Sequence, residues 1–426
     1  MIKNKLIWIL TAFIGIALFL IFITNFEFLS QKIFLPRYRG TYESFPYFEL
    51  ILGFISWLVI SIVLFFSKNK KYFYIWLIKG GIVTLFLMVF YEAKYGLDAY
   101  VYAIKAITGD ITVPFGNEGT SNIQHINHIF TYIVGNSYYS LKIMNSLIGF
   151  IGLILLYKTY EKVIKNSNLE INNKFIYFFF LFPTVLFWSS ILGKDPLNLF
   201  FIGLFAYGFI HLIDEFKLKY LLMIVVSIWL VSYIRSWWSI IMVTSIFLYY
   251  LKVNSTRSFM LFLIIMPIFT LLAIQFLQTQ GITSIDQMFL KMTDTSSKLA
   301  YGGSSVGVHI ITSFGDYLLW FFPNLFTTLF RPMPWDIRNA FTLIAAIENV
   351  ILFYLAYKYI FKNWHLIYTN KYLKFYILLI FSWSLLYVII SPTNLGMAVR
   401  FKLQVLPLML ILIGVSKSLM EQKRAT

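Results

Sequence analysis

Three aspartates lie where apolar runs of the sequence end, and a carboxylate in such a place can act as an acid or a base. Asp98 follows a long apolar run, and Tyr102 and Lys105 recur after it at helical spacing, which predicts a short helix on the membrane surface. There the Asp98 carboxylate could accept the proton of a sugar hydroxyl as a general base, with helix capping or surface solvation as the alternative. Asp195, in GKDPL, and Asp336, in PMPWDIR, are the other two candidate catalytic acids.

Arginine is distributed unevenly along the chain, and the bias favours anionic ligands. Under the topology set out below, six of the eight arginines face outward, although positive charge in membrane proteins gathers inside. Arginine binds phosphate through a planar fork and does not lose its charge. The candidate substrate-binding residues are four of these arginines, Arg235, Arg331, Arg338 and Arg400, together with Lys194 and Trp237. The alternative is that they anchor at the interface or form ion pairs with outer acidic residues.

The stretch 181–200, LFPTVLFWSSILGKDPLNLF, predicts a helical hairpin whose tip reaches one membrane face. Charged residues seldom lie inside an apolar helix unless they are near its end, so Lys194 and Asp195 mark the tip. Pro196 suits the first turn of the second helix. The two charged residues either hold a lipid phosphate or simply pair with each other.

His125 and His128 are three residues apart in QHINH, so both can face one side of a helix. With a carboxylate such as Glu118 they could bind a metal ion, but the sequence provides no other defined ligand set. Hydrogen bonding to a substrate or to the loop backbone is the favoured interpretation, and both histidines are candidate substrate-binding residues. No metal site and no cofactor are predicted, and a divalent metal stays an open alternative.

The segment 329–338, LFRPMPWDIR, contains two prolines that exclude a regular helix. Irregular backbone at membrane depth is tolerated only where it lines a cavity or packs within protein. This segment, with Arg331, Asp336 and Arg338, is therefore the strongest indication of a site from physical arguments alone. Glu348 lies in an apolar run, which makes it a site candidate unless it pairs with Asn349 or another neighbour.

The composition is that of a helical membrane protein. Of the 426 residues, 59% are hydrophobic and only 12% are charged, where a soluble domain has about 25% charged residues. Apolar runs near 18 residues recur along the chain, which predicts an all-α, polytopic transmembrane bundle. The chain has no cysteine, so it has no disulfide or thiolate chemistry, and its net charge of +17 is explained by cytoplasmic loops rather than by nucleic acid.

The apolar runs predict about twelve spans in a single integral membrane domain, 1–426, with both termini cytoplasmic. The predicted spans are 1–24, 48–66, 72–91, 145–157, 175–192, 197–213, 221–234, 237–251, 259–275, 340–357, 375–391 and 403–415. Lys79 interrupts the third span and is expected to mark an interfacial start, with its ammonium group at the surface. The segments 92–141 and 276–339 are expected to be long external loops with interfacial or re-entrant helices.

The positions of the lysines decide whether residues 317–330 cross the membrane. If this short, proline-containing segment does not cross, the lysine-rich segments 68–71, 158–174 and 358–374 and the C-terminus all share the cytoplasmic side. If it crosses, the last two lie outside. The bias of positive charge towards the cytoplasm favours the first arrangement.

Several segments together resemble a family of multi-span proteins from bacterial surface-polysaccharide assembly. They are DAYVY at 98–102, FPTVLFWSSILGKDPL at 182–197, Arg235, RPMPWD at 331–336 and NLGMAVRFKLQVLPL at 394–408. This pattern is similar to that of GT-C-type membrane glycosyltransferases and the related O-antigen or capsule polymerases. The resemblance implies that Asp98 activates the acceptor and that Lys194, Arg235, Arg331 and Arg400 hold a polyprenyl phosphate or pyrophosphate. Asp98 is followed by Ala99, where the family has a second acid.

The resemblance therefore implies a glycosyltransferase of the bacterial inner membrane. It would take a sugar or oligosaccharide from a polyprenyl-linked donor and pass it to a glycan acceptor on the outer face, next to other polysaccharide-assembly proteins. A repeat-unit polymerase is the alternative within this class. The alternatives from other classes are a flippase or transporter, which would need charges along an internal pathway, and a noncatalytic assembly partner.

Overall fold

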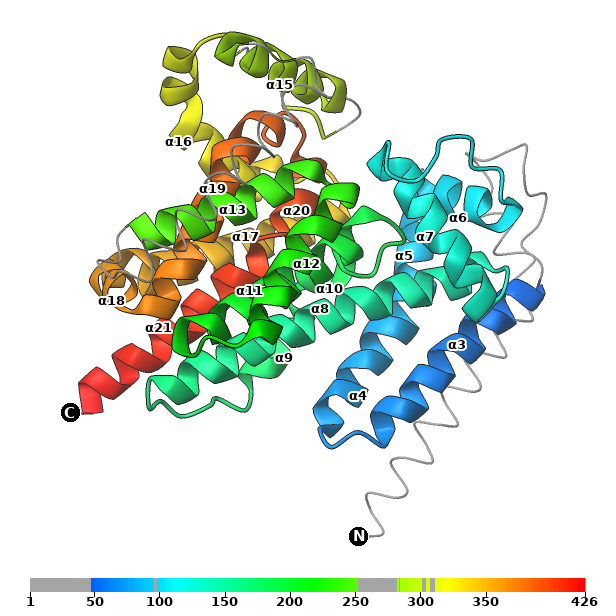
Figure 1. The fold of residues 1–426 in the computed structure, drawn as a ribbon, viewed down its shortest axis with the longest axis horizontal. Helices are drawn as coiled ribbons and strands as arrows, with labels where there is room; N and C mark the ends of the chain where they lie inside the picture. Colours follow the sequence, from blue (N-terminus) through cyan, green and yellow to red (C-terminus); the bar gives the residue numbers. More distant parts are fainter. Residues whose placement is uncertain are drawn as a thin grey trace. The chain divides into compact units, whose positions relative to one another are not determined.

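A computed structural model describes residues 47–95, 98–251, 282, 284–300, 304–306 and 311–425 (Figure 1). Within these residues the regular secondary structure is helical, and the one isolated bridge joins Ser305 to Asn394. The predicted all-α fold is thus confirmed for the described part of the chain. The predicted spans 1–24 and 259–275 lie outside the described residues.

The helices form two compact units. The first contains the described residues before Val113, together with Ile123–Leu147 and Ser190–Gly193. Its helices are α3 (Tyr47–Phe65), α4 (Lys70–Trp76), the π-helical η2 (Leu77–Leu87), α5 (Met88–Tyr95) and α6 (Ala99–Thr108), with most of α7 (Gly119–Val134) and the start of α8 (Tyr138–Asn166). The elements α4, η2 and α5 follow one another without a break, so Lys70–Glu92 makes one membrane-length helix.

Polar side chains are buried between the helices of the first unit. Lys79 is buried and donates to Ser190 Oγ at 2.7 Å, so the expectation that its ammonium group reaches the surface was wrong. The reason is that Ser190 provides an oxygen partner inside the unit. This partner could not be recognised from the sequence because it is 111 residues away. Lys142 of α8 and Glu92 of α5 form a buried ion pair with an N–O distance of 2.5 Å. The first unit therefore holds ionisable groups inside apolar helices.

The second unit contains residues 113–122, 148–189 and 194–425 of the described chain. Its remaining helices are α9 (Phe175–Leu181), α10 (Pro183–Trp188), α11 (Lys194–Asp214), α12 (Leu218–Ile234), α13 (Ser236–Leu251), α15 (Ile285–Leu299), α16 (Phe314–Phe330), η3 (Pro334–Asp336), α17 (Ala340–Tyr359), η4 (Phe361–Asn363), α18 (Trp364–Thr369), α19 (Lys371–Ile390), α20 (Leu395–Lys402) and α21 (Leu406–Ala425). The helices α11, α12, α13 and α19 pack in succession (Figure 1). This packing brings together helices that are far apart in the sequence, such as α13 and α19.

Two predicted spans have different helical limits in the structure. Residues 175–192 do not form one helix, because Pro183 has no backbone N–H and begins the separate helix α10. The predicted short span 145–157 is part of α8, which has 29 residues. Apolar composition identified both regions, but it did not determine where the helices begin and end.

Six helices of the described chain are long and apolar enough to cross a membrane, which supports a membrane protein. They are Phe48–Phe65, Lys70–Glu92, Tyr138–Asn166, Lys194–Asp214, Ala340–Thr369 and Lys371–Ile390. The pair Leu395–Lys402 and Leu406–Lys423, bent by 58°, makes a seventh if it is one broken span. These helices do not confirm the predicted number of about twelve.

Candidate functional site

The turn before α11 places two charged residues at the start of a membrane-length helix. Gly193 has a φ of 155°, which favours glycine, and α11 begins at the next residue, Lys194. Asp195 thus lies in the first turn of α11, where the helix dipole stabilises a negative charge. The turn lies at residues 189–193, between α10 and α11, so the predicted tip was misplaced: Lys194 and Asp195 belong to the helix and not to the turn.

The Asp195 carboxylate is shared by two arginines from distant helices. Arg235, at the end of α12, donates from a terminal nitrogen to Oδ1 at 2.7 Å, and Arg400 of α20 donates from Nε to Oδ2 at 2.5 Å. All three side chains are buried. We call Asp195, Arg235 and Arg400 the arginine cluster. It brings two guanidinium groups to one buried carboxylate.

Aromatic rings support both guanidinium groups. The guanidinium of Arg235 lies 5.1 Å from the centre of the Phe401 ring, and that of Arg400 lies 5.6 Å from Trp188. Such cation–π contacts stabilise a desolvated arginine and hold its plane in place. The sequence identified the three members of the cluster as separate candidates, and the structure brings them together.

Lys194 and Trp237 lie next to the cluster but have other surroundings. Lys194 was expected to bind a ligand or to pair with Asp195. In the structure its ammonium group donates to Thr120 Oγ1 at 2.9 Å. Trp237 is half-buried at the start of α13. The adjacent Trp238 is fully buried and donates to Gln404 at 2.9 Å, as does Trp383. The partner of Trp238 could not be predicted, because Gln404 is 166 residues away in the sequence.

A second buried polar group lies on the other side of α20. Lys402 is fully buried, 3.6 Å from the Glu348 carboxylate and hydrogen-bonded to the Asn349 side-chain oxygen. Glu348 also accepts from the backbone N–H of Thr184, at the start of α10, at 2.6 Å. The expected partner of Glu348 was a neighbour in sequence, but the structure provides Lys402. Lys402 was not among the predicted candidates, although its place two residues after Arg400 in an apolar segment was a usable signal.

Arg331 and Asp336 bind each other through two hydrogen bonds, of 3.0 and 2.6 Å. Asp336 also accepts from the backbone N–H of Met333 at 2.8 Å. Partial burial raises the pKa of Asp336, but these hydrogen bonds and the arginine charge outweigh it, so the pKa lies below its ordinary value. The fork of Arg331 is thus used within the loop 331–336. Arg338 is exposed beside this loop.

The remaining candidates belong to the first unit. Asp98 is exposed immediately before α6, and its carboxylate accepts a long hydrogen bond of 3.4 Å from Tyr102. His128 donates from Nδ1 to the Ala106 carbonyl at 2.6 Å, which agrees with backbone hydrogen bonding. His125 is half-buried on the same helix, α7. In the described part of the chain, no three His, Cys, Asp or Glu residues are grouped in a way that could hold a metal ion.

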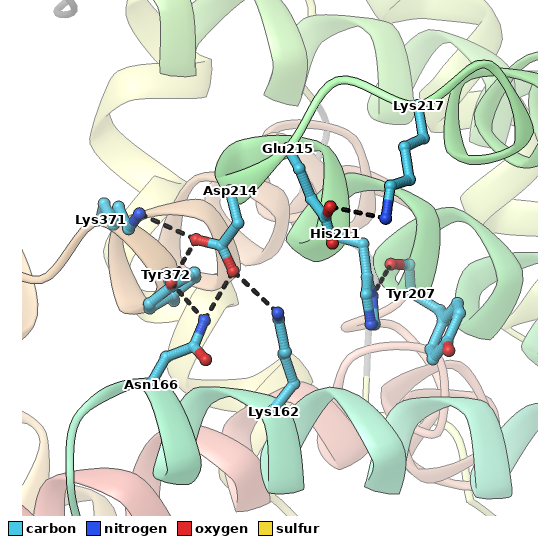
Figure 2. Close-up of polar contacts among 9 residues, drawn as sticks. All are labelled: Lys162, Asn166, Tyr207, His211, Asp214, Glu215, Lys217, Lys371 and Tyr372. Carbon is cyan, nitrogen blue, oxygen red and sulfur yellow. Dashed lines mark hydrogen bonds and ion pairs between the residues drawn. The ribbon is translucent and has the colours of Figure 1, made fainter.

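A contrasting polar cluster lies at the other end of α11 (Figure 2). Asp214, the last residue of this helix, accepts from Lys371 at 2.8 Å and Lys162 at 3.1 Å. Asn166 and Tyr372 also donate to its carboxylate. We call these five residues the lysine cluster. It joins the lysine-rich segments 158–174 and 358–374, which were predicted to share one side of the membrane.

The two clusters are separated by the length of α11. This helix has 21 residues and therefore spans about 30 Å, close to the thickness of the hydrocarbon core of a bilayer. The second unit thus has an arginine-containing end and a lysine-containing end. The C-terminal helix also reaches the lysine end, where Gln422 donates to the Asn168 carbonyl at 3.5 Å.

Comparison with known proteins finds no match, since no protein-family model, no curated protein and no solved structure matches this chain. The class that the fold defines is an all-helical protein with several membrane-length helices. A more specific interpretation depends on the geometry of the two clusters.

Proposed function

We propose that the protein is a glycosyltransferase of the bacterial inner membrane that acts in surface-polysaccharide assembly. It transfers a sugar or oligosaccharide from a polyprenyl phosphate or pyrophosphate to a glycan acceptor on the outer face. The observation that supports this most is the arginine cluster, with two buried guanidinium groups and one carboxylate at the end of a membrane-length helix. Guanidinium groups that are already held in position suit an anionic ligand, and a lipid phosphate brings such a group to the membrane surface.

The proposed chemistry assigns separate roles to the charged residues. An acceptor hydroxyl attacks the anomeric carbon of the donor, its proton passes to a carboxylate, and the bond from that carbon to the phosphate oxygen breaks. The leaving phosphate retains the electron pair, and Arg235 and Arg400 stabilise its charge because they are already fixed in position. Asp195 holds both arginines, so its two oxygens are occupied. The family resemblance assigns the role of base to Asp98.

The proposed topology follows the same distribution of charge. The arginine end of α11 faces outward and the lysine end faces the cytoplasm, in a chain of about twelve spans with both termini cytoplasmic. The lysine cluster supports this orientation, since lysine gathers on the cytoplasmic side of membrane proteins.

A transporter of lipid-linked sugars is the second candidate, favoured by a different observation. The pairs Lys142–Glu92 and Lys402–Glu348 and the buried Lys79 place ionisable groups within membrane-length helices or the bent pair. Such groups often mark transport or proton pathways. Two of these three groups are one-to-one ion pairs, whereas the arginine cluster brings two guanidinium groups to one carboxylate at a helix end, so the transferase is the stronger candidate.

Reconstitution distinguishes the two functions. The purified protein is placed in liposomes with a fluorescent polyprenyl-linked saccharide and an acceptor glycan. A transferase releases polyprenyl phosphate or pyrophosphate and lengthens the acceptor, whereas a transporter only moves the labelled lipid between leaflets. The length of the product then separates the addition of one sugar from polymerisation.

A matched pair of variants tests the site. Arg235→Gln should abolish most of the transfer, and Lys371→Gln, at the lysine end, should retain it. Transfer by Arg235→Gln at the wild-type rate would contradict the proposed function of the arginine cluster.

A further inference from the structure

A short segment of the external loop is attached to the arginine end of the second unit. Residues 113–122 lie against the last turn of α12, where the Asn122 side chain donates to the Tyr233 carbonyl at 2.6 Å. The Asn122 side-chain oxygen also accepts from the backbone N–H of Gly116 at 2.6 Å. Gly116 has a φ of 101°, which L side chains rarely adopt, so the turn depends on glycine here.

The contact between this segment and the helices is close. A Cβ atom on Gly119 would lie 2.4 Å from the carbonyl oxygen of Ile234 and 3.5 Å from Nζ of Lys194. Thr120 accepts the hydrogen bond from Lys194 described above. Residues 119 and 120 therefore lie beside the residues that precede Arg235 and Asp195 in the chain.

Aromatic rings are exposed along this attachment. Phe115 stacks on Tyr233 with ring centres 5.4 Å apart and planes at 26°. Trp229, one helical turn before Tyr233, meets it edge to face at 5.7 Å. Phe115 is 52% exposed and Trp229 is 60% exposed, so both side chains are accessible at the surface. These three rings form what we call the aromatic row.

Polar groups border the aromatic row. Asn117 and Glu118 are exposed and follow Phe115 and Gly116 in the turn. The Glu118 carboxylate can accept hydrogen bonds from hydroxyl groups, and the Asn117 amide can both donate and accept them. Lys194 adds a positive charge on the side of the arginine cluster. Rings with a polar border match a ligand that has C–H faces and a rim of hydroxyl groups.

We infer that the aromatic row and residues 117–118 form a subsite for a saccharide ring, and this inference rests on the proposed function. The C–H groups of a pyranose carry partial positive charge and pack on the negatively charged face of an aromatic ring. Glu118 and Asn117 then bind its hydroxyl groups. The closeness of Lys194 and the arginine cluster sets the ring next to a phosphate, so the subsite holds the sugar portion of a phosphate-linked glycan.

The same rings could instead belong to the aromatic belt that many membrane proteins have at the interface. A belt requires only rings, however, and does not account for the glycine-dependent turn that stacks Phe115 on Tyr233. A direct binding measurement separates the two interpretations without any transfer reaction.

The experiment measures saturation-transfer difference NMR on the full chain in nanodiscs. The probes are the methyl glycosides of glucose, galactose, N-acetylglucosamine and N-acetylgalactosamine. Wild type should transfer saturation to the C–H face of at least one glycoside. Phe115→Leu, which retains the bulk and loses the ring, should weaken binding about two- to tenfold. Glu118→Gln, an exposed change that leaves the packing intact, should also weaken it.

The matched control is Phe216→Leu, because Phe216 is 64% exposed and lies two residues before the start of α12, away from Trp229 and Tyr233 near its end. It should bind as the wild type does. The subsite is refuted if no glycoside binds to wild type, or if Phe115→Leu and Glu118→Gln both bind like the control. Binding without transfer would support the subsite and refute the glycosyltransferase, and transfer without binding would do the opposite.

Discussion

Replacing Asp195 by asparagine tests the arginine cluster most directly. The amide has nearly the shape of the carboxylate but no charge, so the change leaves Arg235 and Arg400 as two buried cations without their counter-charge. Asp195 is 1% exposed, and its oxygens lie 2.7 and 2.5 Å from the two guanidinium groups. Breaking a buried ion pair by removing one partner costs about 3–5 kcal/mol. We expect Asp195→Asn to lower the free energy of unfolding by about this amount.

Removing one arginine should cost less. Arg235→Gln leaves Asp195 paired with Arg400 at 2.5 Å, so the buried residue pair is neutral. The loss is then mainly a hydrogen bond to a charged group, about 1.5–3 kcal/mol. The predicted loss of unfolding free energy is larger for Asp195→Asn than for Arg235→Gln. This order follows from the charges that remain in the cluster and not from the number of contacts removed.

The assay is denaturant unfolding in mixed micelles, followed by the fluorescence of the 11 tryptophans. The matched control is Asp214→Asn, the same substitution at the other end of α11. The Asp214 side chain is 15% exposed and its partner Lys371 is 53% exposed, so water replaces the lost ion pairs and the cost should be near 1 kcal/mol. A smaller loss for Asp195→Asn than for Asp214→Asn, or an equal loss for Arg235→Gln and Asp195→Asn, would refute the reasoning.

Four further outcomes are expected. Arg400→Lys keeps the charge but not the fork, so in vitro transfer should fall strongly; near-normal transfer would reduce Arg400 to an anchor. Asp98→Asn should lower transfer by about 10²- to 10⁴-fold at normal expression, whereas a helix cap would tolerate asparagine. In the cysteine-free chain, a cysteine at Ala300 should react with an impermeant label from outside and one at His365 should not; the reverse would exclude the proposed topology. The pKa of Asp336 is lowered on folding, so its contribution to stability is present above the ordinary carboxyl pKa and is lost as pH falls through the folded pKa. The difference in unfolding free energy between wild type and Asp336→Asn should therefore vanish in acid. A difference that persists in acid would contradict the ion pair of Asp336 with Arg331.

The class of the protein could be predicted from the sequence because hydropathy is a local property. A run of apolar residues satisfies its own backbone only as a helix in lipid, so the runs predict helices wherever they occur. A helix start near residue 193 was also predictable, since glycine, charge and proline follow one another there, but the charged residues and Pro196 lie within α11. Helix limits were less certain, as the break at Pro183 and the length of α8 show.

The candidate site could be predicted only as a set of separate residues. The bias of arginine towards one predicted face picked out Arg235 and Arg400, and the hairpin picked out Asp195. Asp195 and Arg400 are 205 residues apart in the sequence, and no local pattern indicates so distant a partner. Lys79 and Lys402 were misjudged or missed for the same reason, because their oxygen partners, Ser190 and Glu348, are far away in the sequence.

Sequence by itself determined the all-helical fold, the membrane class and the types of side chain available for chemistry, since these depend on composition and on near neighbours in the chain. Tertiary structure alone decided which charges neutralise one another. In a buried environment an ionic side chain is stable only beside its partner, and packing brings the partners together from helices that are far apart in the chain. The pairing of Asp195 with both arginines, and of Asp214 with the lysines at the other end of α11, was set in this way.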